Sequence, residues 1–360
     1  MKVVFFVPVL NIGGYERVVI NYANYFSNHH DVTIVCGKAE GEMRKAISPD
    51  VQVVDLQVRA RFLLFALTKW LKANRADIFY VPFATYTSIA VLAKKFARSR
   101  VIIYGIQHGF ENNGKIVSWV LRRFIQQADV LGAVSPAVAE HESKRWKIDR
   151  VKYHIFDNPV FAAERATTSL DLDWFKKAEG PVLVTSGRLA RDKHIEIPIM
   201  ILAEVKKTHP NVRLLILGDG PEKDDLEMLV CKLGVEDSVL FAGYVNDPIA
   251  YMEHCDIYMQ TSEIESFGNG VIEAQTCDLP AIVTDCGGPV DLIGDKFGVC
   301  IGRFDHPEVV KNGADAVRQM ITKEVSFSGM RENSTRYNVA NLEEQFFEPY
   351  HRIKSKDLTR

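Results

Sequence analysis

Short apolar runs alternate with longer stretches of helical periodicity along the whole chain. In the first half these runs are continuous, as in KVVFFVPV at residues 2–9 and RVIIYGIQ at residues 100–107. Continuous apolar runs are typical of parallel strands that are covered on both faces. We predict further strands over DVTIVCG, VQVVDL, ADIFYVP and ADVLGAVS, with helices between them over Glu16–Phe26, Thr87–Phe96 and Lys115–Gln127. This order predicts an α/β fold with a doubly wound sheet.

The pattern pauses at residues 157–181 and then restarts. A second strand set is predicted over PVLVTSGRL, VRLLILGDGP, SVLFAGY, CDIYMQTS and PAIVTDC. We expect one Rossmann-like domain over 1–160, a linker over 161–180 and a second such domain over 181–337. A last helix at about 338–356 is expected to pack back on the first domain. Two doubly wound domains place their ligand loops on either side of a cleft.

Composition favours a cytoplasmic protein. The first apolar run ends at a glycine turn, without the small-residue cleavage site of a signal peptide. We find no run of the roughly 18 apolar residues that a membrane-spanning helix needs. The six cysteines are scattered and form no CxxC pair, so reduced core residues are expected rather than a disulfide or zinc framework.

Charge divides unevenly along the chain. Residues 1–160 carry 22 Lys and Arg against 13 Asp and Glu, and residues 161–360 carry 22 against 33. The segment RARFLLFALTKWLKANR at 59–75 mixes basic residues with Phe, Leu and Trp70. Such a face suits an anionic membrane surface, whereas the alternative is an amphipathic helix whose Phe62, Leu63 and Leu67 belong to the core. We find no nucleic-acid-binding module.

Glycines and basic residues follow several predicted strands. Gly13 and Gly14 follow the first strand, permit positive φ and precede a helix, but they form no GxGxxG fingerprint. Arg188 and Lys193 follow the first strand of the second domain, where they suit a diphosphate. The alternatives are a tight turn at the glycines and ordinary solvent-facing positions for the two basic residues.

Two glutamates bracket a predicted helix start in TSEIESFGNGVIEAQTC. Glu265 is expected in the loop before the helix and Glu273 about one turn inside it. Gly268, Asn269 and Gly270 leave backbone N–H groups accessible at the positive end of the helix dipole. A helix start flanked by two carboxylates that accept from hydroxyls indicates a nucleotide-sugar site.

This arrangement resembles the Glu-x7-Glu motif of retaining glycosyltransferases with the GT-B fold, most closely family 4. Further resemblances are GGYERVV, QHG, NPV, SGRLARDKH, LGDGP, ESFGNGVIEA and VTDCGGPVDLI, in the order and with the separations found in that family. Together they cover almost the whole chain. The resemblance implies a GT-B fold, with two Rossmann-like domains facing a cleft.

The resemblance also implies roles for matching residues. Arg188 and Lys193 would bind the donor diphosphate, and Glu273 would bind the ribose. Glu265, with Phe267, Gly268 and Asn269, would hold the donor sugar. Gly13 and Gly14 would meet the diphosphate on closure of the cleft, and His108 would lie beside the transferred sugar.

Three positions depart from the family pattern. His194 follows the diphosphate lysine where glycine is commoner, so the local turn is expected to differ. Asp291 stands where the family usually has glutamate, and we leave it out of the site. Tyr15 replaces a small residue and is expected to narrow the acceptor or donor pocket. A Tyr15→Ala change that left both affinities unaltered would count against that hypothesis.

The family implies sugar transfer with retained anomeric configuration and without a metal or other cofactor; a UDP-sugar is the expected donor. The DxD spacing at 171–173 lies in the predicted linker and is interpreted as charged surface. The expected acceptor is a glycan or lipid-linked glycan at the inner face of the cytoplasmic membrane, in cell-surface polysaccharide or lipopolysaccharide synthesis. Alternatives are a GT-B sugar-nucleotide epimerase and a non-catalytic nucleotide-sugar sensor.

Overall fold

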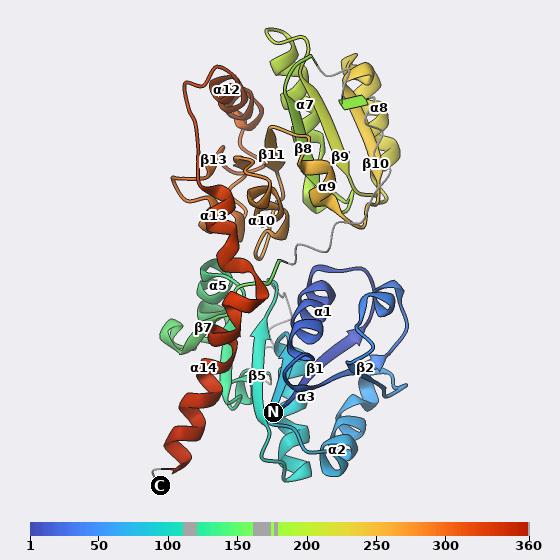
Figure 1. Ribbon diagram of the computed structural model, residues 1–360, viewed down its shortest axis with the longest axis vertical. Helices are drawn as coiled ribbons and strands as arrows, with labels where there is room; N and C mark the ends of the chain where they lie inside the picture. The colour runs from blue at the N-terminus through green and yellow to red at the C-terminus, as the bar shows by residue number, and fades with distance from the viewer. Residues whose placement is uncertain (111–120, 161–173, 176–178, 359–360) are drawn as a thin grey trace. The chain divides into compact units, whose positions relative to one another are not determined.

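The chain divides into two compact units, each built around its own parallel sheet. The computed structural model describes residues 1–110, 121–160, 174–175 and 179–358 (Figure 1). Unit 1 consists of Met1–Phe161 and Tyr337–Arg360, and unit 2 consists of Ala162–Arg336. The predicted linker over 161–180 lies mostly outside the described residues, as does part of the predicted helix over Lys115–Gln127.

Seven parallel strands form the sheet of unit 1, in the order β3-β2-β1-β4-β5-β6-β7. Their bounds are β1 Lys2–Val9, β2 Asp31–Lys38, β3 Gln52–Asp55, β4 Ile78–Pro82, β5 Ile102–Gln107, β6 Val130–Ala133 and β7 Tyr153–Ile155. Six of them confirm the predicted apolar runs. The seventh was not predicted, because three residues are too few to show a period.

The helices of unit 1 that are described from end to end are α1 Gly14–Phe26, α2 Leu63–Ala73, α3 Ala84–Ala97, α5 Pro136–Trp146 and α14 Val339–Leu358, with short 3-10 turns at Glu42–Ala46, Ala60–Phe62 and Arg150–Lys152. Residues 121–125, within the predicted helix Lys115–Gln127, are helical as well. On α2, Leu63 and Leu67 are core residues that pack with the apolar residues of β4 and β5. Phe62 and Phe65 point outward, with exposed fractions of 49% and 73%. The alternative that these three residues belong to the core is therefore right for Leu63 and Leu67 and wrong for Phe62.

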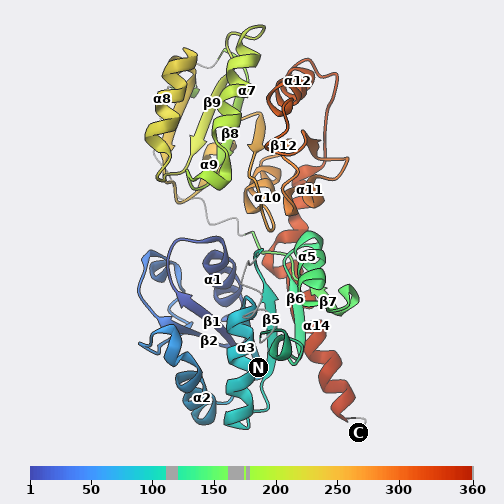
Figure 2. The same ribbon diagram turned by 180° about the vertical axis from the view of Figure 1, so that it is seen from behind.

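The terminal helix α14 closes one apolar face of this sheet. Phe346 is fully buried, and its ring centroid lies 6.0 Å from that of Phe5, 5.1 Å from that of Tyr22 and 5.8 Å from that of Tyr80. Both views show α14 running beside β5 and β7 (Figure 2). Because a buried phenyl side chain contributes about 1.5–3 kcal/mol, the end of the chain is an integral part of the core of unit 1.

Unit 2 repeats the same strand order with six parallel strands, β10-β9-β8-β11-β12-β13. The strands are β8 Val182–Ser186, β9 Arg213–Leu217, β10 Val239–Gly243, β11 Ile257–Gln260, β12 Ala281–Val283 and β13 Gly298–Cys300. The helices are α7 Glu196–Lys206, α8 Lys223–Leu233, α9 Pro248–Met252, α10 Asn269–Thr276, α11 Gly288–Ile293, α12 Val309–Ile321 and α13 Met330–Ser334, with 3-10 turns at Arg191–Lys193, Glu236–Ser238 and Thr335–Tyr337. The five predicted strands are confirmed; the short edge strand β13 was not predicted.

Each sheet reverses its strand order at one place, between β1 and β4 in unit 1 and between β8 and β11 in unit 2. In open α/β sheets, ligands bind outside the carboxyl ends of the strands at such a reversal. The loops that follow β1, β4, β8 and β11 are therefore the places to examine for a site. The prediction of two doubly wound parallel sheets is confirmed.

Candidate active site

Two segments far apart in sequence meet at the carboxyl ends of β8 and β11. The ammonium Nζ of Lys193 lies 2.6 Å from Oε2 of Glu265, although 72 residues separate them. The amide Nε2 of Gln260, the last residue of β11, donates to the same oxygen at 3.1 Å. Within the described part of the chain, Oε1 of Glu265 has no hydrogen-bond partner. One carboxylate oxygen is thus held by the protein, and the other is available to accept from a ligand hydroxyl.

Backbone contacts fix the loop that carries Glu265. Its N–H donates to the carbonyl of Cys286 at 2.7 Å, and its own carbonyl accepts from the N–H of Gly288 at 2.9 Å. The N–H of Glu263 donates to the carbonyl of Asp192 at 2.9 Å. A Cβ on Gly288 would lie 2.5 Å from the carbonyl oxygen of Phe267, so only glycine permits this approach. The carboxylate of Glu265 is therefore positioned before any ligand arrives.

Arg188 lies in a different environment from Lys193. Its side chain is 69% exposed, and the nearest carboxylate oxygen, Oδ1 of Asp192, is 3.5 Å from its guanidinium. Lys193 is 22% exposed and paired with Glu265. Exposed ion pairs contribute only about 0–1 kcal/mol. Arg188 can therefore leave Asp192 at little cost and turn to an anionic ligand.

The helix α10 begins within the segment where a helix start was predicted. Gly268 precedes the helix with φ +102, a left-handed conformation that favours glycine, and Asn269 is the first helical residue. Phe267 is buried beneath the loop. The first backbone N–H groups of a helix have no intrahelical partners and lie at the positive end of its dipole. This turn can bind a phosphate or sugar oxygen.

Glu273 lies one turn inside α10 and is only 7% exposed. Next to it is the buried hydroxyl of Tyr258, 3.1 Å from Oγ of Ser186. Burial raises the pKa of Tyr258, and the negative charges of Glu273 and Glu265 raise it further. A Cβ on Gly270 would lie 2.1 Å from this hydroxyl. Sequence reasoning missed Tyr258 and Ser186; a hydroxyl within an otherwise apolar strand was the available signal.

His194 forms the turn after Lys193 in the conformation that glycine favours, with φ +47. Its ring stacks on Phe304 at a centroid distance of 4.3 Å and a plane angle of 20°. Nδ1 of the same ring lies 2.6 Å from Oε1 of Glu196. These contacts offset the cost of the left-handed backbone. The expectation was that the turn would differ because histidine replaces glycine. Instead, His194 itself adopts the left-handed conformation.

The loop after β1 differs from expectation in its backbone. Gly13 caps α1 with an extended φ of −165, and neither Gly13 nor Gly14 has a positive φ. A Cβ on Gly13 would lie 2.2 Å from Oε2 of Glu16, so this carboxylate covers the glycine. Burial raises the pKa of Glu16. Neither glycine is left-handed, and the contact of this loop with a ligand stays a prediction.

His108 follows β5 and is contacted by three aromatic rings. Their centroids lie 4.7 Å away for Tyr15, 5.8 Å for Tyr80 and 6.4 Å for Phe83. The hydroxyl of Tyr80 is 2.7 Å from Nε2 of His108. Burial lowers the pKa of His108 to about 3. The imidazole is therefore neutral at physiological pH.

Tyr15, the departure from the family pattern in GGYERVV, packs its ring edge against His108. Its hydroxyl donates to the carbonyl of Phe6 in β1, and the side chain is almost fully buried. This anchoring keeps the ring beside His108. The hypothesis that Tyr15 narrows a pocket stays a prediction for the Tyr15→Ala variant.

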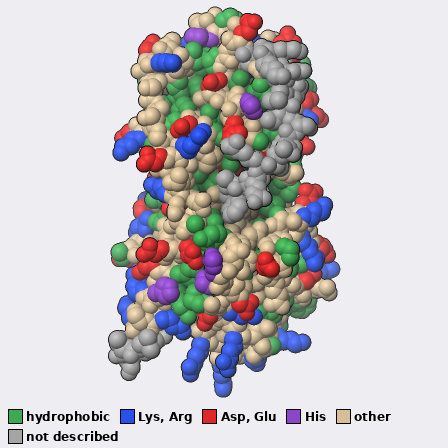
Figure 3. Space-filling view, viewed as in Figure 1, with side chains coloured by type: hydrophobic (Ala, Val, Ile, Leu, Met, Phe, Trp, Pro, Cys, Tyr) green, Lys and Arg blue, Asp and Glu red, His purple; other side chains and the backbone are tan. Residues whose placement is uncertain are grey.

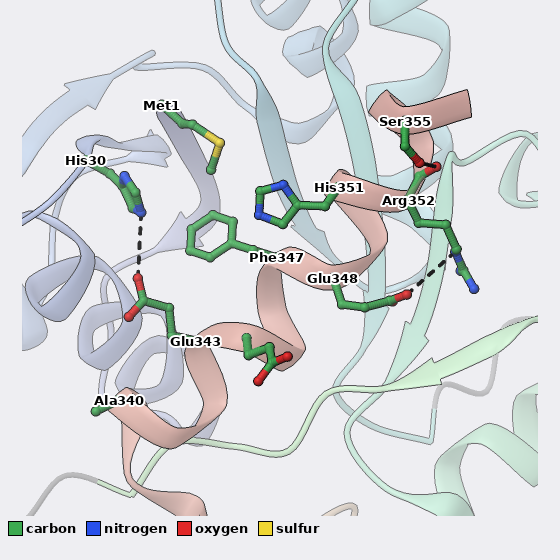
Figure 4. A pocket seen from close by; sticks show the side chains of 10 residues that line it. Met1, His30, Ala340, Glu343, Phe347, Glu348, His351, Arg352 and Ser355 are labelled. Atoms are coloured by element: carbon green, nitrogen blue, oxygen red, sulfur yellow. Dashed lines mark hydrogen bonds and ion pairs between the residues drawn. The ribbon is translucent and has the colours of Figure 1, made fainter. Parts of the chain in front are cut away.

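A separate hollow in unit 1, of about 860 Å³, lies away from these loops (Figure 4). Met1 and His30 line it and stand directly before β1 and β2, at the amino ends of the strands. Glu343 and Phe347 of α14 line its other side, with Oε1 of Glu343 3.8 Å from Nε2 of His30. Its location at the opposite edge of the sheet separates this hollow from the predicted site.

The structure thus gathers the predicted residues into two groups. Gly13, Gly14 and His108 lie at the strand ends of unit 1, and the other predicted residues lie at those of unit 2: Arg188, Lys193, Glu265, Phe267, Gly268, Asn269 and Glu273. Asp171 and Asp173 fall outside the described residues. Where the structure is described, no group of three or more His, Cys, Asp or Glu side chains could hold a metal ion. All six cysteines are free.

Family comparisons match both units. The model described as Glycosyltransferase Family 4 matches residues 12–163, and that described as Glycosyl transferases group 1 matches residues 170–338. The two parallel sheets agree with the GT-B fold, and the two family models make the chain a glycosyltransferase. The chain belongs to glycosyltransferase family 4.

Similar proteins agree with this assignment. An alpha-1,4-N-acetyl-D-galactosaminyltransferase of Campylobacter jejuni, named for a diphospho-undecaprenol-linked acceptor, is 28% identical over 86% of this chain and 87% of its own. The lipopolysaccharide outer core galactosyltransferase WaaB shares the fold with a TM-score of 0.76 at 21% identity, over 99% of this chain and 100% of its own. HepE of Anabaena, solved with UDP-glucose, does so with a TM-score of 0.74 at 19% identity, over the same shares of the two chains. The predicted GT-B fold is confirmed.

Proposed function

We propose that this glycosyltransferase moves a sugar from a UDP-sugar to a glycan or lipid-linked glycan, with retention of the anomeric configuration. The reaction would serve cell-surface polysaccharide or lipopolysaccharide synthesis at the inner face of the cytoplasmic membrane. The observation that carries the proposal is the cluster at the reversal point of unit 2. There Lys193 pairs with Glu265, which precedes the start of α10 at Asn269.

Each part of the cluster suits one part of a nucleotide sugar. Arg188 and Lys193 provide positive charge for the diphosphate, next to the positive end of α10. Glu265 offers Oε1 to a sugar hydroxyl, supported by backbone groups of Phe267, Gly268 and Asn269. Glu273, one turn further along the helix, is assigned to the ribose hydroxyls.

The mechanism proposed for retention needs no covalent sugar intermediate. Glu265 is tied through Oε2 to Lys193 and Gln260, which suits it to hold a hydroxyl rather than to attack the anomeric carbon. His108 is a very weak base, because its pKa lies near 3. The leaving diphosphate itself would take the acceptor's proton during attack on the same face. Its charge would be stabilised by Arg188, Lys193 and the helix end rather than by a divalent metal.

The classes of donor and acceptor are supported by similar proteins. HepE was solved with UDP-glucose, which favours a uridine nucleotide as carrier. The Campylobacter enzyme is named for a lipid-linked glycan acceptor, and a lipopolysaccharide core glycosyltransferase of Rhizobium meliloti is 30% identical over 46% of this chain. The family models and these relatives are all glycosyltransferases, so the epimerase and sensor alternatives are not favoured.

We expect UDP to stabilise the protein more than GDP, ADP or CMP in thermal unfolding. A ligand at 100 times its dissociation constant adds roughly 2.7 kcal/mol. A unit of this size shifts by about 2–4 °C for each kcal/mol. Arg188→Ala should reduce the shift without lowering the melting temperature of the free protein, because this side chain is exposed. Glu273→Gln should also reduce it.

The absence of a shift with every nucleotide would contradict the assigned donor site. A melting-temperature shift with GDP alone would support the assigned donor site but would make a GDP-sugar the donor instead of a UDP-sugar. Turnover is then measured as release of the nucleotide diphosphate from its sugar, with and without a diphospho-undecaprenol-linked glycan. EDTA is expected to leave the rate unchanged.

Membrane contact is proposed through α2 and the end of α3. Phe65 and Phe96 are exposed large apolar side chains on these two packed helices, and Phe62 is another in the 3-10 turn directly before α2. Exposed basic residues lie on or next to the same helices, namely Arg59, Arg61, Lys69, Lys72, Lys95, Arg98 and Arg100. Figure 3 shows lysine and arginine side chains gathered near this end of unit 1. Each basic residue near an anionic surface contributes about 1 kcal/mol. In the described part of the chain, no helix is long and apolar enough to cross a bilayer.

Phe65→Glu is expected to weaken binding to vesicles that contain anionic lipid. The change replaces a 73% exposed apolar ring with a charge that the surface repels. Sedimentation with phosphatidylglycerol vesicles should show at least a tenfold fall, as expected for a loss of about 1.4 kcal/mol or more. Met228→Glu on α8, another exposed apolar residue, is the matched control and should bind normally. Equal vesicle binding by Phe65→Glu and Met228→Glu would contradict the proposed membrane contact through α2.

A further inference from the structure

The hydrogen bond between Tyr80 and His108 determines which nitrogen of the imidazole carries the proton. Tyr80 lies in the middle of β4, is 1% exposed and directs its hydroxyl to Nε2 of His108 at 2.7 Å. In a neutral imidazole one nitrogen bears hydrogen and the other accepts. The direction of this single bond therefore fixes the tautomer of His108.

Tyr80 is held rigidly from two sides. Its ring stacks on Phe346 of α14, with a centroid distance of 5.8 Å and a plane angle of 15°. The ring of Phe5 in β1 lies 5.4 Å away on a tilted plane. Neither contact involves the hydroxyl. Ring packing thus sets the position of the hydroxyl, and the same packing would hold a phenylalanine ring in Tyr80→Phe.

The tyrosine must donate rather than accept. Nε2 of His108 is the one hydrogen-bond partner of the Tyr80 hydroxyl in the described part of the chain. If Nε2 carried the hydrogen, the hydroxyl proton would be buried without an acceptor, which is costly. Burial also raises the pKa of Tyr80, so its proton is retained. Nε2 consequently accepts, and the hydrogen of the imidazole lies on Nδ1.

We propose that Tyr80 is a positioning residue that holds His108 as the Nδ1–H tautomer, so that His108 presents a hydrogen-bond donor to an oxygen of the bound nucleotide sugar. Nδ1 of His108 has no hydrogen-bond partner within the described residues. It is not among the buried atoms that lack a partner there, so it is accessible to a ligand. The ring is only partly covered by its aromatic neighbours. The chemistry recognised is a hydroxyl or phosphate oxygen acting as acceptor. This assignment of a ligand rests on the proposed function, whereas the tautomer does not.

The test uses Tyr80→Phe, with Tyr104→Phe as the matched control. Tyr104 is a buried tyrosine that pairs with Tyr80 in the register of β4 and β5, and its hydroxyl does not bond to His108. Nitrogen-15 NMR of histidine-labelled protein distinguishes the two tautomers, and His108→Gln identifies the resonance by its loss. The wild type and Tyr104→Phe should show Nδ1–H. Tyr80→Phe should show a shift of population toward Nε2–H.

Turnover adds a second readout. Tyr80→Phe is expected to lower kcat about tenfold or more with the dissociation constant for UDP unchanged, because His108 is assigned to the sugar and not to the nucleotide. An Nε2–H tautomer in the wild type would overturn the proposal. An unchanged tautomer and kcat in Tyr80→Phe would overturn the positioning role. Nδ1–H in the wild type together with no binding of any nucleotide would instead count against the proposed function, and it would leave the tautomer assignment standing.

Discussion

Replacing Glu265 with glutamine is expected to cost on the order of 30- to 1,000-fold in kcat/KM. The substitution removes the negative charge that Lys193 contacts at 2.6 Å and Gln260 at 3.1 Å. Truncating one member of a partly buried charge pair costs about 2–4 kcal/mol, and each 1.36 kcal/mol is a factor of ten in rate. The loss should appear in transfer of the sugar, because this carboxylate is assigned to a sugar hydroxyl.

Binding of free UDP should behave in the opposite way. In Glu265→Gln the ammonium of Lys193 no longer has Glu265 as its counter-ion, so it is freed for the diphosphate. We expect the dissociation constant for UDP to stay equal or to fall. Calorimetric titration with UDP and steady-state kinetics with the sugar nucleotide measure the two effects separately.

Glu263→Gln is the matched control for this variant. Glu263 is two residues away, is more exposed than Glu265, and its carboxylate lies 3.8 Å from Nε2 of His194 rather than near Lys193. Its replacement should leave kcat/KM within a factor of about three, as is usual for surface substitutions. Equal losses in the two variants, or a loss of UDP binding in Glu265→Gln, would contradict the role assigned to Glu265.

Gly270→Ala is expected to destabilise unit 2 and to abolish most nucleotide binding. The added Cβ would lie 2.1 Å from the hydroxyl of Tyr258 and 3.0 Å from Oγ of Ser186. Both neighbours are held by packing within the sheet, so the start of α10 must move. Overpacking of this kind costs about 1–3 kcal/mol, and the displaced helix start would no longer meet the ligand. The melting temperature and the UDP-induced shift report the two effects.

Tyr258→Phe in the same chain should partly restore both quantities, because it removes the atom that the new Cβ meets first. Gly218→Ala serves as the comparison. There the added Cβ would lie 1.8 Å from the carbonyl oxygen of Gly187, and φ is +147. Its loss of stability should not respond to Tyr258→Phe. If Tyr258→Phe rescued both glycine variants or neither, the proposed clash at Gly270 would be wrong.

The sequence alone determined where most strands of both sheets lie along the chain. Strands buried on both faces must be apolar throughout, so runs such as KVVFFVPV could be recognised without any partner. The position of α10 was equally local, because Gly268 and Asn269 mark a helix start through their own backbone preferences. The edge strands β7 and β13 were not predicted, because three residues are too few to show a hydrophobic pattern.

Only the tertiary structure decided which side chains meet. Lys193 and Glu265 pair because β8 and β11 are neighbours in the sheet, which no local pattern encodes. Tyr258 and Tyr80 lie in predicted apolar strands. Only the structure shows that the hydroxyl of Tyr258 lies against Gly270 and that of Tyr80 against His108. The extended backbone of Gly13 was likewise set by the fold around it. Periodicity reports burial along one segment, whereas chemistry at a strand end depends on contacts between segments.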